Sequence, residues 1–188
     1  MQLVRPATQH LDSYVNALKR GWSADNLRGA VAAQEELARI SEDPSAFLAV
    51  MEDREAKGPP VKLSDGSSVS RIPGLRRWLW DGEFCGSIGL RWQHGTVELP
   101  PHCLGHIGYA VVPWKQGKGY ATAALRPMLS EARTIGLPYV EVTTEPENLA
   151  SQRTILSCGG ELFEHFIEPA QFGSKPALRF RIPLSHSR

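Results

Sequence analysis

The chain has few cysteines, no long apolar run and no excess of charge of either sign. Its 188 residues hold three cysteines, an odd number spread widely along the chain, which argues against the disulfide framework of a secreted protein. The N-terminal residues lack the apolar segment of a signal peptide, and no run approaches the length of about 18 apolar residues that a membrane span requires. We therefore expect a cytoplasmic protein with no membrane partner.

Charge is balanced along the chain, and this balance bears on the choice of partner. Lysine and arginine total 21, aspartate and glutamate total 20, and the formal net charge is +1. A chain without a basic excess has no electrostatic footprint for a phosphate backbone, so we expect no nucleic-acid partner. A chain of this size can bury one core without metal or disulfides, which predicts a single domain over residues 1–188.

Helical signals dominate the first third of the chain. A short strand is predicted over Gln2–Arg5, and apolar residues then recur at helical spacing from Ala24 to Ile40, with further helical turns between residues 45 and 55. Residues 58–74 are rich in glycine, proline and serine. This composition predicts an exposed loop, or at most a short hairpin around Asp65 and Gly66.

Strand signals follow from residue 77 onward. The dipeptide Asp81–Gly82 between two apolar runs predicts a hairpin turn. An amphipathic helix follows Gly119 and is closed by Gly136. The expected strands are 77–80, 83–92, 103–112, 139–143, 161–167 and 178–184, and the expected helices are 119–135 and 149–158.

This order of elements predicts an α+β fold, or equivalently a mixed α/β sheet. A right-handed crossover through the helix at 119–135 would place the strands at 103–112 and 139–143 parallel. A ligand cleft is then expected beyond their C-terminal ends.

Two glycines, Gly117 and Gly119, stand at the junction of a strand and the amphipathic helix. They allow a tight turn that brings consecutive amides to one point in front of the helix dipole, and such a site suits a pyrophosphate. Lys118 adds a positive charge. A simple connecting turn is the alternative explanation. The spacing excludes a P-loop, and the third glycine of the dinucleotide fingerprint would fall on Thr122.

Gln116, Gly119 and Ala121 fit the pattern Gln/Arg-x-x-Gly-x-Gly/Ala, which resembles the acetyl-CoA loop of the GNAT superfamily of N-acetyltransferases. The resemblance extends through the segments GHIGYAVVPWKQGKGYATAAL and EVTTEPENLASQRTILSCGGEL, and residues 76–184 follow the element order of the family. Within the family, the chain looks most like a group of predicted bacterial acetyltransferases whose substrates are mostly unassigned.

The resemblance implies a central, mostly antiparallel sheet flanked by helices, in which a splayed parallel strand pair forms a slot for acetyl-CoA. Residues 1–75 would form the acceptor side of the domain and residues 76–184 the acetyl-CoA side. Capping of the following helix is an equally good explanation of Asn148. The implied cofactor-binding residues are Val111, Val112, Gln116, Gly117, Lys118, Gly119, Tyr120, Ala121, Asn148 and Ser151, with the backbone amide of Val111 or Val112 as the donor to the acetyl oxygen.

Two side chains are candidate general bases. His106 lies on the predicted central strand near a position where related enzymes often carry a glutamate, and an imidazole titrates in the useful pH range; a core histidine is an equal alternative. Glu141 on the next strand is the second candidate, with a salt-bridged or solvated carboxylate as its leading alternative. The family often carries a tyrosine seven residues after the asparagine, where this chain has Ile155, and we expect a tyrosine to be tolerated there. His102, Cys103 and His106 match no zinc pattern, so we expect no metal.

These observations predict an N-acetyltransferase that moves an acetyl group from acetyl-CoA to a primary amine of an unidentified small-molecule or peptide acceptor by direct attack. The missing tyrosine leaves open a catalytically degenerate acyl-CoA-binding sensor or interaction module. A nucleotide-binding protein using the same loop is a third alternative, and it would be stabilised by ATP or NAD. The exposed edge strands of such a sheet are compatible with a homodimer.

Overall fold

The computed structural model describes residues 1–63 and 66–184 of the chain. Its first elements are β1 (Gln2–Val4), α1 (Thr8–Lys19), α2 (Gly29–Glu42) and α3 (Pro44–Ala49). Helix α2 begins at Gly29 rather than at the predicted Ala24, because Asp25 forms a turn of its own. The Asp25 carboxylate accepts hydrogen bonds from the amides of Leu27 and Arg28 at 3.0 and 2.9 Å.

The segment predicted as helical from residue 45 to residue 55 divides in two. Asp43 caps α3 by accepting hydrogen bonds from the amides of Ser45 and Ala46, at 3.0 and 2.9 Å. Helix α3 ends at Ala49, and Glu52–Asp53 then form the short strand β2. The predicted helix is therefore too long at its C-terminal end.

The larger sheet has the strand order β1-β5-β6-β7, with β2 also pairing with β5, and every pair in it is antiparallel. Strands β5 (Gly74–Trp80) and β6 (Phe84–Arg91) form the hairpin predicted from Asp81–Gly82. Two further short strands, β3 (Val61–Lys62) and β4 (Ser68–Val69), pair antiparallel on either side of Gly66, as the prediction of a short hairpin requires; Asp65 lies outside the described residues.

Strand β7 spans Ile107–Val111, so the prediction of a strand from Cys103 is wrong at its start. The amide of Cys103 donates to the carbonyl of Pro100 at 2.9 Å, which closes a turn instead of extending the strand. The β7 ladder with β6 therefore begins after His106.

The smaller sheet has the order β8-β10-β9, again with antiparallel pairs. Its strands are β8 (Tyr139–Thr144), β9 (Glu161–Ile167) and β10 (Pro176–Pro183), and the helices of this half are α4 (Tyr120–Ile135) and α5 (Leu149–Ser157). Helix α4 connects β7 to β8, as predicted. These two strands, both wholly within the described residues, lie in separate sheets and share no ladder.

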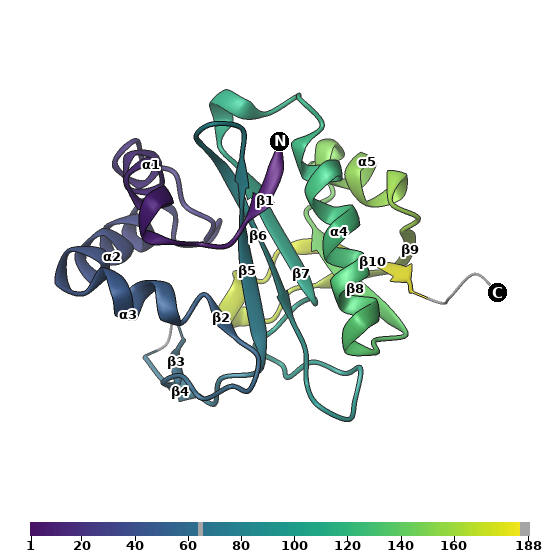
Figure 1. Ribbon diagram of the computed structural model, residues 1–188. Coiled ribbons are helices and arrows are strands. Elements are labelled where there is room, and N and C mark those ends of the chain that lie inside the picture. Colours follow the sequence, from purple (N-terminus) through teal and green to yellow (C-terminus); the bar gives the residue numbers. More distant parts are fainter. Residues whose placement is uncertain (64–65, 185–188) are drawn as a thin grey trace.

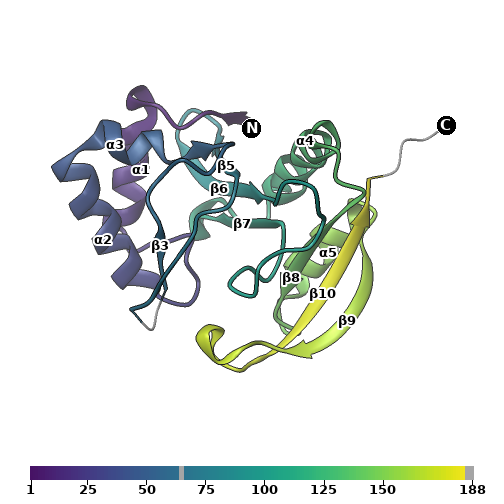
Figure 2. The ribbon, with the colours of Figure 1, turned by 90° about the horizontal axis from the view of Figure 1, so that it is seen from below.

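The helices cover the larger sheet on both faces. Figure 1 shows α1, α2 and α3 on one side of β5 and β6, with α4 and α5 on the other side. Figure 2, seen from below, shows β8, β9 and β10 extending away from the larger sheet on the side of α5. The architecture is the predicted mixed α+β fold, with antiparallel sheets flanked by helices.

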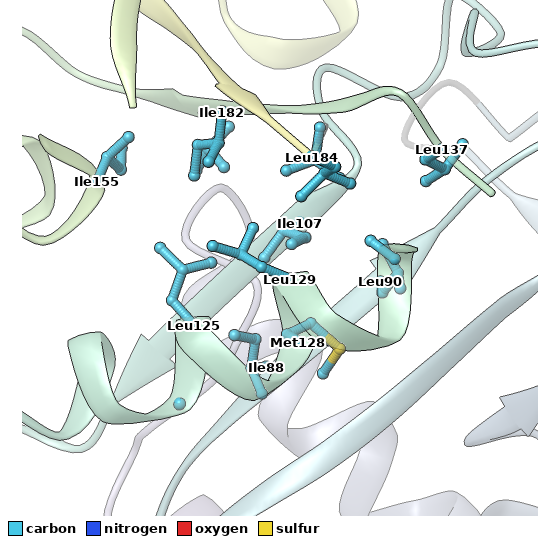
Figure 3. Close-up of a cluster of buried hydrophobic side chains, with 14 of the residues drawn as sticks. Ile88, Leu90, Ile107, Leu125, Met128, Leu129, Leu137, Ile155, Ile182 and Leu184 are labelled. Carbon is cyan, nitrogen blue, oxygen red and sulfur yellow. The ribbon is translucent and has the colours of Figure 1, made fainter. Parts of the chain in front are cut away.

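Helix α4 packs against both sheets through one apolar face. Its residues Ala124, Leu125, Met128, Leu129 and Ala132 are buried, as their spacing predicts. In Figure 3, this face meets Ile88, Leu90 and Ile107 of the larger sheet and Ile182 and Leu184 from the smaller one. Burial of such side chains stabilises a fold by about 1.5–3 kcal/mol each. No helix within residues 1–63 and 66–184 combines the length and the apolar character needed to cross a bilayer.

A second core fills the space between α1–α3 and the opposite face of the larger sheet. It is built on aromatic rings, and Tyr14 of α1 stacks on Trp78 of β5 with ring centroids 4.5 Å apart. Phe84 and Trp22 pack edge-on around this pair. Since Trp78 is fully buried, the tryptophans of the hairpin serve the core as well as the sheet.

Candidate functional site

The glycine loop joins the end of β7 to the start of α4. A 3-10 turn, Pro113–Lys115, follows Val112, and the chain then passes through Gly117 and Gly119 with φ angles of +74° and +73°. A Cβ atom added to either glycine would meet no atom within 4 Å. Glycine is therefore favoured here by the left-handed backbone and not by crowding, and the space in front of the loop is open.

The first turn of α4 presents free backbone donors to this space. Ala123 makes the first helical hydrogen bond, to the carbonyl of Gly119 at 3.0 Å, so the amides of Tyr120, Ala121 and Thr122 have no partner within the helix. Within the described residues, no side chain caps this end of α4. Donors without partners at a helix N-terminus, reached through a glycine turn, fit the negatively charged pyrophosphate that the resemblance implies.

Asp81, which the sequence marks only as a turn residue, holds this loop in place. Its carboxylate accepts hydrogen bonds from the Tyr120 hydroxyl at 2.7 Å and from Nζ of Lys115 at 2.9 and 3.0 Å. The bonds from Tyr120 and Lys115 keep the pKa of Asp81 well below its usual range. Lys115 also pairs with Glu83 at 2.7 Å, so its charge is balanced by acids, whereas Lys118 is exposed on the loop.

One edge of β7 has backbone groups that β6 does not use. Val112 donates to the carbonyl of Cys85 at 2.9 Å, and the neighbouring pair is Gly86 with Val111. Hydrogen-bonded and non-hydrogen-bonded pairs alternate in an antiparallel ladder, so the N–H and C=O groups of Tyr109 and Val111 point away from β6. Since β8 forms no ladder with β7 in the described chain, this edge can accept an extended ligand as an extra strand.

The two candidate donors to the acetyl oxygen, the amides of Val111 and Val112, therefore differ in whether they already have a hydrogen-bond partner. The amide of Val112 is occupied by Cys85, and the amide of Val111 faces the unpaired edge. The Val111 carbonyl accepts a hydrogen bond from Nε2 of Gln116 at 3.3 Å, so the Gln116 side chain folds back onto the end of the strand.

Asn148 and Ser151 lie at the start of α5, facing the end of β7. The side chain of Asn148 accepts a hydrogen bond from the Ser151 amide at 3.0 Å, which is the helix cap that the sequence leaves as an alternative. The Ser151 hydroxyl lies 2.9 Å from the hydroxyl of Tyr109. Burial raises the pKa of Tyr109 to about 12, so this phenol carries its proton at neutral pH.

Ile155, at the position where the family often carries a tyrosine, is a core residue. It is fully buried, and a Cβ added to Gly160 would collide with its Cγ2 atom. This packing speaks against the expectation that a tyrosine would be tolerated there, because the surrounding atoms leave no room for a larger side chain.

His106 is buried, with 1% of its surface exposed, and both of its ring nitrogens have partners. Nε2 lies 2.9 Å from the carbonyl of Val97, and Nδ1 accepts a hydrogen bond from the Glu141 amide at 3.0 Å. Burial lowers the pKa of His106. The sequence is equally compatible with a general base and with a core histidine at this position. The geometry supports the core histidine, because the Nδ1 lone pair already accepts a hydrogen bond.

The carboxylate of Glu141 is held by two arginines of β10, Arg181 at 2.7 Å and Arg179 at 3.6 Å. Both oxygens of this carboxylate are engaged by arginines, and the geometry supports the salt-bridged alternative for Glu141. Over the described parts of the chain, no three histidine, cysteine, aspartate or glutamate side chains are grouped as metal ligands.

Comparisons with known proteins agree with this architecture. Residues 36–161 match the family model described as Acetyltransferase (GNAT) domain. The fold is similar to that of a spermidine N-acetyltransferase variant from Vibrio cholerae, at 16% identity and a TM-score of 0.57, over 98% of this chain and 96% of that one. It is also similar to a microcin C7 self-immunity acetyltransferase in complex with acetyl-CoA and AMP, at 16% identity and a TM-score of 0.61, over 96% and 91% of the two chains. Among curated proteins, none matches the sequence.

Proposed function

The chain belongs to the GNAT acetyltransferase family, and on that premise we propose that this acetyltransferase takes its acetyl group from acetyl-CoA and passes it to a primary amine by direct attack. The family resemblance predicted from Gln116, Gly119 and Ala121 is thereby confirmed. One observation carries the proposal: the unpaired edge of β7 leads directly into the glycine loop at the start of α4.

We assign the binding of the cofactor to backbone groups. The unpaired N–H and C=O groups of Tyr109 would bind the extended pantetheine arm, and the amides from Gly117 to Ala121 would bind the pyrophosphate. The exposed Lys118 would add charge at the phosphates. Ser151 and Asn148 would face the arm from the other side.

In this proposal, no side chain takes part directly in acetyl transfer. Acetyl-CoA supplies a thioester whose carbonyl carbon an amine can attack, with the thiolate as leaving group. The Val111 amide, which points to the unpaired edge, would stabilise the negative charge that develops on the acetyl oxygen. We assign the proton of the amine to solvent water, because the Nδ1 lone pair of His106 and the carboxylate of Glu141 are already engaged.

The acceptor would approach from the side of the N-terminal helices and of the loop that precedes β7. These segments, residues 20–75 and 93–104, form the acceptor side in this proposal. The spermidine N-acetyltransferase with a similar fold is named for a small polyamine, and we extend this to a small molecule or peptide with a primary amine as the acceptor class here.

Release of free thiol from acetyl-CoA tests the proposal. A panel of primary amines, including polyamines, amino acids and short peptides with a free N-terminus, is mixed with the protein and acetyl-CoA. The proposal predicts amine-dependent thiol release and an acetylated amine detected by mass spectrometry. Binding of acetyl-CoA without release for any amine would favour the acyl-CoA-binding sensor instead.

A further inference from the structure

His106 occupies the point at which the two sheets meet. Its amide donates to the carbonyl of Glu141 in β8 at 2.8 Å, and its carbonyl accepts from the amide of Arg91 in β6 at 2.9 Å. The ring adds the bond from the Glu141 amide and the contact with the carbonyl of Val97. One residue thus links β6, β8 and the loop that precedes β7.

The partners of the ring determine its protonation state. A carbonyl such as that of Val97 can only accept, so Nε2 must carry a proton, and an amide such as that of Glu141 can only donate, so Nδ1 must carry a lone pair. The neutral Nε2–H tautomer satisfies both. A second proton, on Nδ1, would point at the N–H group of Glu141, whose nitrogen lies 3.0 Å away. Two donors would then face each other without an acceptor between them.

Charged groups face the ring from β6, β8 and β10. Glu141 faces it from β8 and is paired with Arg179 and Arg181 of β10; Arg91 faces it from β6. Tyr139 of β8 packs edge-on, with ring centroids 6.3 Å apart. None of these groups replaces the Glu141 amide as a partner of Nδ1, so the junction depends on the tautomer of this ring.

We propose that His106 is a positioning residue that sets the opening between β7 and β8, and hence the acetyl-CoA slot, by joining the two sheets as the neutral Nε2–H tautomer. This inference rests on the proposed function. Beyond His106, the edge of β7 at Tyr109 and Val111 forms no ladder with β8. The position of this edge relative to α5 therefore depends on where β7 and β8 are joined.

Three substitutions separate the two ring contacts. His106→Asn keeps an acceptor at the place of Nδ1 and loses the contact with Val97, whereas His106→Gln reaches Val97 and loses the acceptor for Glu141. His106→Ala loses both. The exposed His94 of the preceding loop provides a control, His94→Asn. An unpaired buried amide shifts an equilibrium by roughly tenfold, so we expect CoA binding to weaken about tenfold in the Gln and Ala variants and by less than about threefold in the Asn variant.

Calorimetric titration with CoA, acetyl-transfer kinetics and thermal unfolding of each variant test the inference. Rescue by the Asn variant in both CoA affinity and kcat supports positioning. Equal CoA affinity in all three folded variants would show that His106 serves stability alone, and a 10²- to 10⁴-fold fall of kcat in the Asn variant with unchanged CoA affinity would make His106 the base; either outcome overturns the inference.

Nuclear magnetic resonance of ¹⁵N-labelled histidine tests the tautomer independently of activity. The His106 signals, assigned by their loss in His106→Asn, should show a protonated Nε2 and an unprotonated Nδ1 at neutral pH. An Nδ1–H tautomer or a charged ring would overturn the inference. If the wild-type protein failed to bind CoA, the proposed function would fail, while these signals would still decide whether the junction exists.

Discussion

The hydroxyl of Tyr120 donates a hydrogen bond of 2.7 Å to the carboxylate of Asp81, and the first residue of α4 is thereby tied to the turn between β5 and β6. The two residues are 39 positions apart in the chain. Through this bond and the one from Lys115, Asp81 in the β5–β6 turn positions the loop that we assign to the pyrophosphate.

Replacement of Asp81 by asparagine should therefore weaken CoA binding. The new side-chain amide would still accept from Tyr120 but would no longer balance the charge of Lys115, so we expect a loss of about three- to tenfold in affinity. Calorimetric titration measures it. Asp12→Asn, at an exposed aspartate of α1, is the control and should bind CoA as the wild type does. An unchanged affinity in Asp81→Asn would mean that the loop is held by its own backbone.

The contact between Tyr109 and Ser151 should couple β7 to α5. In a double-mutant cycle with Tyr109→Phe and Ser151→Ala, we expect a coupling free energy of about 0.5–1.5 kcal/mol in urea unfolding, as for an ordinary buried hydrogen bond. Additive effects of the two substitutions would contradict a hydrogen bond in solution between the hydroxyls.

Ile155→Tyr should destabilise the protein. The side chain of Ile155 is fully buried, and overpacking of a core costs about 1–3 kcal/mol. Thermal unfolding measures the loss, and Leu156→Tyr provides the control, since Leu156 is the neighbouring residue of α5 and is 53% exposed. A variant as stable as the wild type would show that the helix can turn to accommodate the ring.

Acidification should reduce stability through His106. Burial lowers the pKa of this residue in the folded state, whereas the unfolded chain binds the proton near the ordinary value of about 6.5. Since the unfolded state binds more protons, the contribution of His106 to the free energy of unfolding is constant above about pH 6.5. It falls as the pH drops from there toward the lowered pKa. Urea unfolding from pH 8 to pH 5 should show a smaller fall in His106→Asn than in the wild type. If stability fell equally with pH in the wild type and in His106→Asn, His106 would not be the source of the acid sensitivity.

Local sequence signals are enough to predict the elements around the site. Helix α4 is predicted correctly because Gly119 and Gly136, both with positive φ, bound an amphipathic segment at its two ends. The hairpin of β5 and β6 follows from Asp81–Gly82 for the same kind of reason. Where one residue fixes a turn, its neighbours can be predicted from sequence alone.

Contacts between distant segments cannot be predicted in this way. The partners of His106 lie in a loop and in another sheet, 9 and 35 positions away, and nothing in the local sequence identifies them. The same holds for the bond between Tyr109 and Ser151, which are 42 positions apart. The choice between a catalytic and a structural histidine depends on such contacts, and for this reason the sequence leaves it open.

Two matched glycine variants test whether the loop before α4 binds the pyrophosphate of acetyl-CoA. At both Gly119 and Gly136, which lie at opposite ends of α4, the backbone is left-handed and an added Cβ meets no atom within 4 Å. Glutamate at either position should therefore cost about 1–2 kcal/mol of stability, and somewhat more at Gly136, where the carboxylate opposes the helix dipole. We expect acetyl-CoA to raise the melting temperature of the wild type and of Gly136→Glu but not of Gly119→Glu, because only the carboxylate at residue 119 would face the pyrophosphate. Equal stabilisation of both variants by acetyl-CoA, or stabilisation of the wild type by ATP or NAD instead, would contradict this expectation.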